Sequence, residues 1–398
     1  MTVELGFSTL LGMVGVVALV YMWLGYRHRQ VTESVPMPVR RSMSGEDLRK
    51  LQGAFSIDTF YATSINNYQD GAIVRGNLRS DPANAYFQVK TGIQRLLGDG
   101  YQLFLVEGQD RRPMMVVLPE RPVSTVSWRE KALAGLLLFL TIIACIWVGQ
   151  EWQLGWGVVI VIGLIVGVRI LARWWVAKQY QIGMGVPCLL PSWQLGCFGL
   201  ADRFISPVPD RRVLFELAIA PTVASGLLSL VLVGVGLWLS AMGQAEMEIP
   251  SQIFQASVLM ALLAKLALGS SLHSNFVVIH PLVLLGWLGL GITALNLLPA
   301  GQLDGGRLVQ AIYGRMTASW TTVLTLVCLA IVALFQPIAL YWGVVILFLL
   351  RDLEPPMLNE LVETTPEQDG IGILLLFLML LVLFPLTPTV AEFLQIGG

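Results

Sequence analysis

Runs of about 20 apolar residues recur along the chain. Each is long enough for a helix to cross the roughly 30 Å hydrocarbon core of a bilayer. Only 13% of the residues are charged, against about 25% in soluble domains, so an ordinary soluble protein is excluded. We predict an all-α polytopic membrane protein with the lipid bilayer as its surroundings. Its eight expected spans are 6–25, 131–149, 155–177, 213–241, 277–299, 319–335, 337–351 and 371–388. The run at 337–351 is short for a span, so whether it crosses the bilayer stays open.

An apolar stretch at 253–269 is short and carries Lys265, which predicts a re-entrant or interfacial segment. Lys and Arg gather between alternate pairs of spans: fifteen lie in 26–131 and four in 178–212. The positive-inside rule therefore places both segments in the cytoplasm or in the stroma of a plastid. The net charge of −1 gives no global field for nucleic acid, so no nucleic-acid partner is expected.

Three regions follow from this pattern: a membrane anchor at 1–25, a linker with a small cytoplasmic or stromal α+β insert at 26–130, and a membrane domain at 131–390. Within the insert, residues 28–54 are polar and predict a loose linker with a short helix. Alternation and turn residues beyond it predict the order β-α-β-β. The expected elements are strand 72–79, helix 83–97, and strands 101–107 and 114–118.

One motif carries chemistry, Asn296-Leu-Leu-Pro-Ala-Gly-Gln-Leu-Asp-Gly-Gly-Arg307, at the end of an apolar span. An aspartate at a membrane helix end is costly and marks a functional site. The run resembles the NxxPxxxLDGG motif of the site-2 proteases, which are intramembrane zinc metalloproteases. That resemblance implies that Asp304 is the third zinc ligand and that Asn296 helps to position substrate. It also implies a site-2 protease core at 155–312.

Pro191-Ser-Trp-Gln194 resembles the loop after the first core helix of this family. Gly76-Asn-Leu-Arg79 and Gly98-Asp-Gly-Tyr-Gln-Leu-Phe104 resemble the soluble insert of one branch, the plastid and cyanobacterial ethylene-dependent gravitropism-deficient and yellow-green type. The resemblance implies a thylakoid or plasma membrane of a photosynthetic organism. It also implies a cavity for a substrate or partner, for which we expect the lining residues Ser192, Trp193, Asn296, Pro299, Gly305 and Gly306.

The family's HExxH motif is replaced. In that motif two histidines bind zinc from one helix face and the glutamate activates water. The corresponding residues here are Arg169-Ile-Leu-Ala-Arg173. An arginine offers no lone pair to a metal, and Ile170 cannot move a proton. Zinc is expected for the family, but we expect no metal and no cofactor here. The hypothesis is a catalytically inactive pseudoprotease that binds a transmembrane helix or a membrane-protein partner.

Two other functions stay open: an active intramembrane zinc metalloprotease with unusual ligands, and a transporter or channel. Replacement ligands could be His273 and His280, or Cys188 and Cys197 with Asp304, although packing is the default for buried cysteines. No repeat of the spans is visible, which counts against a transporter.

The spacing of the two arginines also predicts a contact in the structure. Residues 169 and 173 are four apart, so they share one helix face. An unpaired Asp304 in an apolar region is costly, and a guanidinium can hold a carboxylate with two hydrogen bonds. We therefore predict that Arg169 or Arg173 pairs with Asp304. The alternative is that both arginines extend to the membrane surface as snorkelling anchors.

Overall fold

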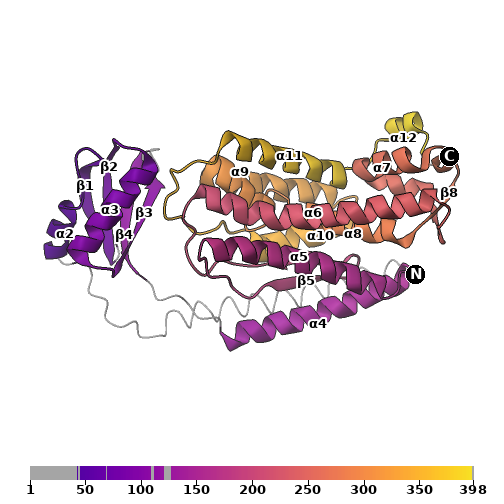
Figure 1. Ribbon diagram of the computed structural model, residues 1–398, viewed down its shortest axis with the longest axis horizontal. Helices are drawn as coiled ribbons and strands as arrows, with labels where there is room; N and C mark the ends of the chain where they lie inside the picture. Colours follow the sequence, from indigo (N-terminus) through magenta and orange to yellow (C-terminus); the bar gives the residue numbers. More distant parts are fainter. Residues whose placement is uncertain (1–42, 44, 69, 109–111, 121–126, 397–398) are drawn as a thin grey trace.

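The computed structural model describes residues 43, 45–68, 70–108, 112–120 and 127–396. The predicted anchor at 6–25 lies outside the described residues. An α+β module and a larger helical region make up the described fold (Figure 1). The module lies beside the left-hand ends of α5, α6, α9 and α11 in that view.

The module contains a four-stranded antiparallel sheet with the order β1-β2-β4-β3. The predicted helix is confirmed: Asp81 caps it by accepting hydrogen bonds from the amides of Ala83 and Asn84, and it ends at Gly98, whose φ is 80°. The elements are α2 (Gly45–Gln52), β1 (Phe60–Tyr68), β2 (Gly71–Leu78), α3 (Pro82–Leu97), β3 (Tyr101–Glu107) and β4 (Pro113–Pro119).

The predicted order β-α-β-β was incomplete because it left out β1. This strand is at an edge of the sheet and reads FYATSINNY, with three exposed residues at its end. Its polar residues hide the alternation that marks a half-buried strand. The short helix predicted within 28–54 is present as α2.

Five described helices are long and apolar enough to cross a membrane. They are α4 (Trp128–Glu151), α5 (Gly157–Gln179), α6 (Arg211–Ala241), α9 (Asp304–Val332) and α11 (Pro366–Leu383). The predicted span at 319–335 is therefore the second part of a longer helix, α9, which bends at Gly314, where φ is 84°.

Two other predicted spans correspond to shorter helices. The span predicted at 277–299 was wrong over its first four residues, because Phe276–Ile279 forms strand β8, which pairs with β7 (Met247–Pro250). The helix that follows, α8 (Pro281–Asn296), is buried over most of its surface and packs against α6. The span at 337–351 is α10 (Pro337–Val345), which continues as the π-helical turn η3 (Ile346–Leu350).

The stretch at 253–269 contains α7 (Val258–Leu268), whose 11 residues reach only about 16 Å. It is flanked by the 3₁₀ turns η1 (Ser251–Ala256) and η2 (Gly269–His273). A short helix, α12 (Pro388–Leu394), follows α11. Because α7 is too short to span a bilayer, it fits the predicted re-entrant or interfacial segment.

The segment 178–212, predicted as a loop on the cytoplasmic or stromal side, contains a hairpin that folds back onto the helices. Strands β5 (Cys188–Ser192) and β6 (Gly196–Ala201) form a hairpin that packs against α4, α5 and α8. Almost every residue of β6 is buried, including Cys197, which joins an apolar cluster with α4 and α5 residues. The apolar composition of this hairpin explains why it lies among helices and not in water.

Candidate functional site

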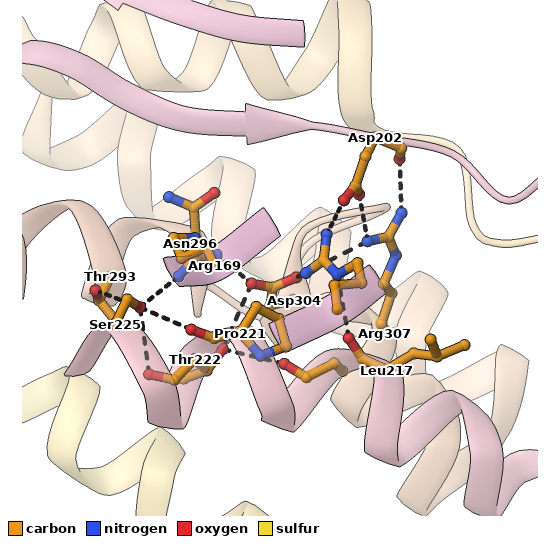
Figure 2. A network of polar contacts seen from close by, with 12 residues as sticks. Arg169, Asp202, Leu217, Pro221, Thr222, Ser225, Thr293, Asn296, Asp304 and Arg307 are labelled. Carbon is orange, nitrogen blue, oxygen red and sulfur yellow. Dashed lines mark hydrogen bonds and ion pairs between the residues drawn. The ribbon is translucent and has the colours of Figure 1, made fainter. Parts of the chain in front are cut away.

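Both arginines of α5 reach the first residue of α9. Arg169 Nη2 pairs with Asp304 Oδ2, and Arg173 Nη2 pairs with Asp304 Oδ1, so each carboxylate oxygen faces a separate guanidinium. The three side chains are between 1% and 4% exposed. The predicted pairing is confirmed for both arginines, and the snorkelling alternative is wrong. Figure 2 shows Arg169 and Asp304 turned toward each other between α5, α6 and α9.

Three more charged side chains extend this pairing. Arg173 also pairs with Asp202, just beyond β6, and Arg307 Nη1 lies 2.7 Å from Asp202 Oδ1. Arg307 Nε in turn donates to Glu354 Oε1 at 2.8 Å. We call the six residues the ion-pair cluster: Arg169, Arg173, Asp202, Asp304, Arg307 and Glu354. With three cations and three anions, its formal net charge is zero.

Neutral donors and acceptors complete the surroundings of the cluster. Arg169 Nη1 donates to Ser225 Oγ at 2.9 Å, and Arg173 Nε donates to the Leu217 carbonyl at 3.2 Å. Thr222 Oγ1 lies 3.4 Å from Asp304 Oδ2. All of these partners come from α6, and Figure 2 shows Thr222 and Ser225 beside Asp304 and Arg169. A buried charge is stable only when paired and hydrogen-bonded in this way.

The pKa of Asp202 shows how strongly the neighbouring arginines stabilise a negative charge. Burial would raise the pKa of its carboxyl, but the guanidinium groups of Arg173 and Arg307 outweigh burial and hold the pKa well below its usual range. Its backbone carbonyl also accepts from Arg307 Nη2 at 2.7 Å. Asp202 therefore stays ionised and ties the β5–β6 hairpin to α5 and α9.

The predicted substrate-positioning residue Asn296 has a structural role in this chain. Its Nδ2 donates to the carbonyl oxygens of Phe198 at 2.9 Å and Ile292 at 2.7 Å, so it joins the end of α8 to β6. Opposite it, Gly199 has a φ of 141°, and a Cβ there would overlap the Asn296 side chain. The hairpin strand and α8 can approach this closely only because residue 199 is glycine.

The remaining residues of the predicted cavity are held by local contacts. Gly305 and Gly306 are buried, and a Cβ on either would overlap backbone atoms of the loop before α9. The Pro299 carbonyl accepts from Thr325 Oγ1 at 3.3 Å. Ser192 Oγ accepts from the amide of Leu195. Of the predicted lining residues, the glycines lie next to Asp304, which they follow in the chain.

Trp193 and Ile170 face other neighbours. The ring of Trp193 lies 4.4 Å from that of Trp147 on α4, measured between centroids. Ile170, the residue expected at the position of the family's catalytic glutamate, packs against the apolar cluster between α4, α5 and β6. The structure therefore brings together the two arginines and the aspartate, while Ile170 contributes packing.

The residues near Asp304 do not fit a zinc ion. Both carboxylate oxygens already pair with guanidinium groups, which are cations without a lone pair for a metal. His273 Nε2 lies 2.9 Å from Lys265 Nζ, and His280 Nδ1 accepts from the amide of Leu282. Across the described part of the chain, no three His, Cys, Asp or Glu side chains gather as a metal site would require. We therefore derive no chemistry from a metal.

Sequence reasoning missed Asp202, Arg307 and Glu354. Arg307 was visible as the last residue of the motif, three positions after Asp304, where a helix places side chains near each other. Glu354 lies 47 residues further on, in a mostly acidic segment between two apolar runs. A count of the buried charges would have indicated that a further anion is needed, because two arginines and one aspartate leave an excess of one positive charge.

Comparison with known proteins agrees with this architecture. A family model described as the EGY3 middle domain matches residues 49–126, which include the α+β module. The chain is 35% identical over 376 residues to the "Probable zinc metalloprotease EGY2, chloroplastic" of Oryza sativa subsp. indica, an alignment that covers 90% of this chain and 68% of that protein.

Two relatives from Arabidopsis thaliana align over a similar extent. The "Probable zinc metalloprotease EGY2, chloroplastic" is 34% identical over 350 residues, covering 83% of this chain and 63% of the relative. The "Probable zinc metallopeptidase EGY3, chloroplastic" is 26% identical over 378 residues, covering 85% and 65%. The chain thus spans about two thirds of the length of these relatives. No solved structure matches the chain. The identity and coverage show that this chain belongs to the EGY group of the site-2 protease family.

Proposed function

We propose that this chain is a catalytically inactive site-2 protease homologue, a pseudoprotease, that resides in a plastid membrane and binds or chaperones a membrane-protein partner. The observation that carries the proposal is the double pairing of Asp304 with Arg169 and Arg173. The chloroplastic names of the relatives support the plastid, and within it we propose the thylakoid membrane. The retained helical core supports a binding role.

The chemistry of the three replaced positions supports the loss of activity. Peptide hydrolysis by a metal-bound water needs ligands that hold the metal and a base that accepts the proton of the water. At positions 169 and 173 stand permanent cations, and at 170 a side chain with no ionisable group. A zinc dication beside two guanidinium groups would also meet strong like-charge repulsion.

The test is a combined measurement of metal content and cleavage. The purified full-length chain is compared in nanodiscs with the Arabidopsis EGY2 relative as the reference, using a helical membrane substrate and added Zn²⁺. We expect no metal-dependent cleavage and far less than one zinc per chain. The proposal is wrong if the chain holds about one zinc, loses it on Asp304→Ala, and cleaves the substrate in a chelator-sensitive way.

The proposed binding role needs its own experiment. A photo-crosslinking amino acid is placed at residue 193, where Trp193 is half-buried beside Trp147 and was expected to line the cavity for a partner. The matched control carries it at Val327, which is 51% exposed on the outer surface of α9. We expect a membrane-protein adduct from position 193 that is absent from position 327. The same adducts from both positions would indicate general contact with membrane neighbours and contradict a dedicated partner surface.

A further inference from the structure

The segment between η3 and α11 connects the ion-pair cluster to the α+β module. We call residues 354–361 of this segment the strap. At its start, the Glu354 carboxylate is 2% exposed and lies 2.6 Å from Arg307 Nη2. The Glu354 amide donates to Gln310 Oε1 at 3.2 Å, and Gln310 Nε2 donates to the Glu354 carbonyl at 3.3 Å. The first residue of the strap is therefore fixed to α9 through both its side chain and its backbone.

Four residues further on, the strap joins the module. The amide of Leu105, in the edge strand β3, donates to the Leu358 carbonyl at 2.8 Å, and the amide of Glu360 donates to the Leu105 carbonyl at 2.9 Å. These bonds form a parallel β-bridge at Asn359. Asn359 Nδ2 also donates to the Pro82 carbonyl at the start of α3, at 3.0 Å. Leu361 packs against the apolar core of the module.

The same residues are also bonded to the helical region. The amides of Leu358 and Asn359 donate to the carbonyls of Val208 and Pro209, each at 2.9 Å, just before α6 begins. The strap therefore lies between β3 on one side and the start of α6 on the other. Only three residues lie between Glu354 and Leu358, the first residue bonded to the module. The chain can therefore span at most about 14 Å between them. A connection this short cannot lengthen much when the module moves.

We propose that the strap couples docking of the α+β module to the integrity of the ion-pair cluster. Displacement of the module would pull residues 358–360 away from the start of α6 and draw Glu354 from Arg307. Arg307 would then lose one of its two carboxylate partners, and its hold on Asp202 would weaken. A protein that binds the module outside the membrane could in this way change the site within it. The inference stands whether or not the chain is inactive as a protease.

Glu360 makes docking of the module costly at one point of the contact. Its carboxylate is 11% exposed and lies 3.9 Å from Arg315 Nη1, and its Oε1 has no hydrogen-bond partner among the described residues. Burial raises the pKa of this carboxyl, and Glu107 adds to the effect. Arg315, a hydrogen bond from the Met357 backbone, and Arg211 oppose it without outweighing burial. Docking therefore desolvates a carboxylate without fully pairing it, a cost that undocking would return.

Hydrogen exchange of the full chain in nanodiscs tests the coupling from the module side. The variant Asn359→Ala removes the bond to Pro82, and the matched control Asn66→Ala changes an exposed asparagine on β1, at the opposite edge of the same sheet. We expect Asn359→Ala to speed exchange in β3 and also in the first turns of α9. The increase should be about fivefold or more, the usual lower range of coupling between sites. The control should leave α9 unchanged.

The reverse experiment starts from the cluster. Coupling is reciprocal, so Glu354→Gln, which weakens the contact with Arg307, should speed exchange of the β3 peptide by a similar factor. Because α9 and β3 are read in separate peptides, a local effect is distinguishable from a transmitted one. The proposal is overturned if Asn359→Ala changes the exchange rate of the α9 peptide by less than about twofold and Glu354→Gln does the same for the β3 peptide. A negative result would refute the coupling alone, because the pseudoprotease proposal is tested separately by metal content and cleavage.

Discussion

Removing Asp304 should destabilise the protein more than removing Asp304 and Arg169 together. In the single variant Asp304→Leu, the cluster carries one excess positive charge. Arg173 keeps Asp202 as a partner, but Arg169 is left with only the hydroxyl of Ser225. In Asp304→Leu/Arg169→Leu the cluster is neutral again, with two arginines and two carboxylates.

The expected magnitudes follow from burial. Arg169 is 1% exposed, so water cannot replace the lost carboxylate. Breaking such a pair costs about 3–5 kcal/mol, whereas apolar replacement of both members is often neutral. We expect the single variant to lose about 3–5 kcal/mol and the double variant about 2 kcal/mol or less, the remainder being imperfect packing. Adding Arg173→Leu should destabilise again, because Asp202 then keeps only Arg307.

The measurement is reversible unfolding in mixed micelles with increasing SDS, followed by tryptophan fluorescence. A double-mutant cycle over residues 169 and 304 gives the coupling free energy directly. As a control, Arg203→Leu removes an arginine whose pairing with Glu130 is solvent-exposed, and it should change stability by under about 1 kcal/mol. If the double variant is as unstable as the single one, the pair does not explain the burial of Asp304.

Three further predictions follow from other features. Restoring peptidase activity should need Arg169→His, Ile170→Glu and Arg173→His together, and each single reversion should leave a cleavage assay at background, because ligands and base act as a unit. Gly305→Ala should lower the unfolding midpoint strongly, since the added methyl group would overlap a backbone carbonyl; Gly163→Ala, which meets no neighbour within 4 Å, is the matched control. The raised pKa of Glu360 predicts that module docking is strongest below its ordinary value of 4.5 and weakens as pH rises through the raised pKa. Protection of the β3 amides, corrected for intrinsic exchange, should follow this pH dependence and lose it in Glu360→Gln.

The central ion pair was predictable because local rules determine it. The spacing of Arg169 and Arg173 puts both on one face of a helix, and the cost of a lone buried carboxylate requires a cation beside Asp304. Helix α3 was predictable for a similar reason, since Asp81-Pro82 and Gly98 are local start and stop signals.

What was missed depends on contacts between distant segments. Glu354 reaches Arg307 from a part of the chain with no helix or strand pattern, and Asp202 reaches two helices from the end of a hairpin. Strand β8 is four residues long and apolar like the helix after it, so periodicity does not separate the two. The boundary did have a local sign, because His280 and Pro281 are the N-cap and first residue of α8. The contacts of Glu354 and Asp202 are fixed by tertiary packing, so a single sequence gives little sign of them.

The zero net charge of the ion-pair cluster has an electrical consequence. A unit charge that crosses a membrane potential of 100 mV gains or loses about 2.3 kcal/mol. Three cations and three anions that move as one body carry no gating charge, so the voltage across the membrane does no net work on a joint displacement. The membrane potential would do net work only on a movement that separates the anions from the cations along the membrane normal. An energised and a de-energised membrane should therefore leave the intact cluster in the same position.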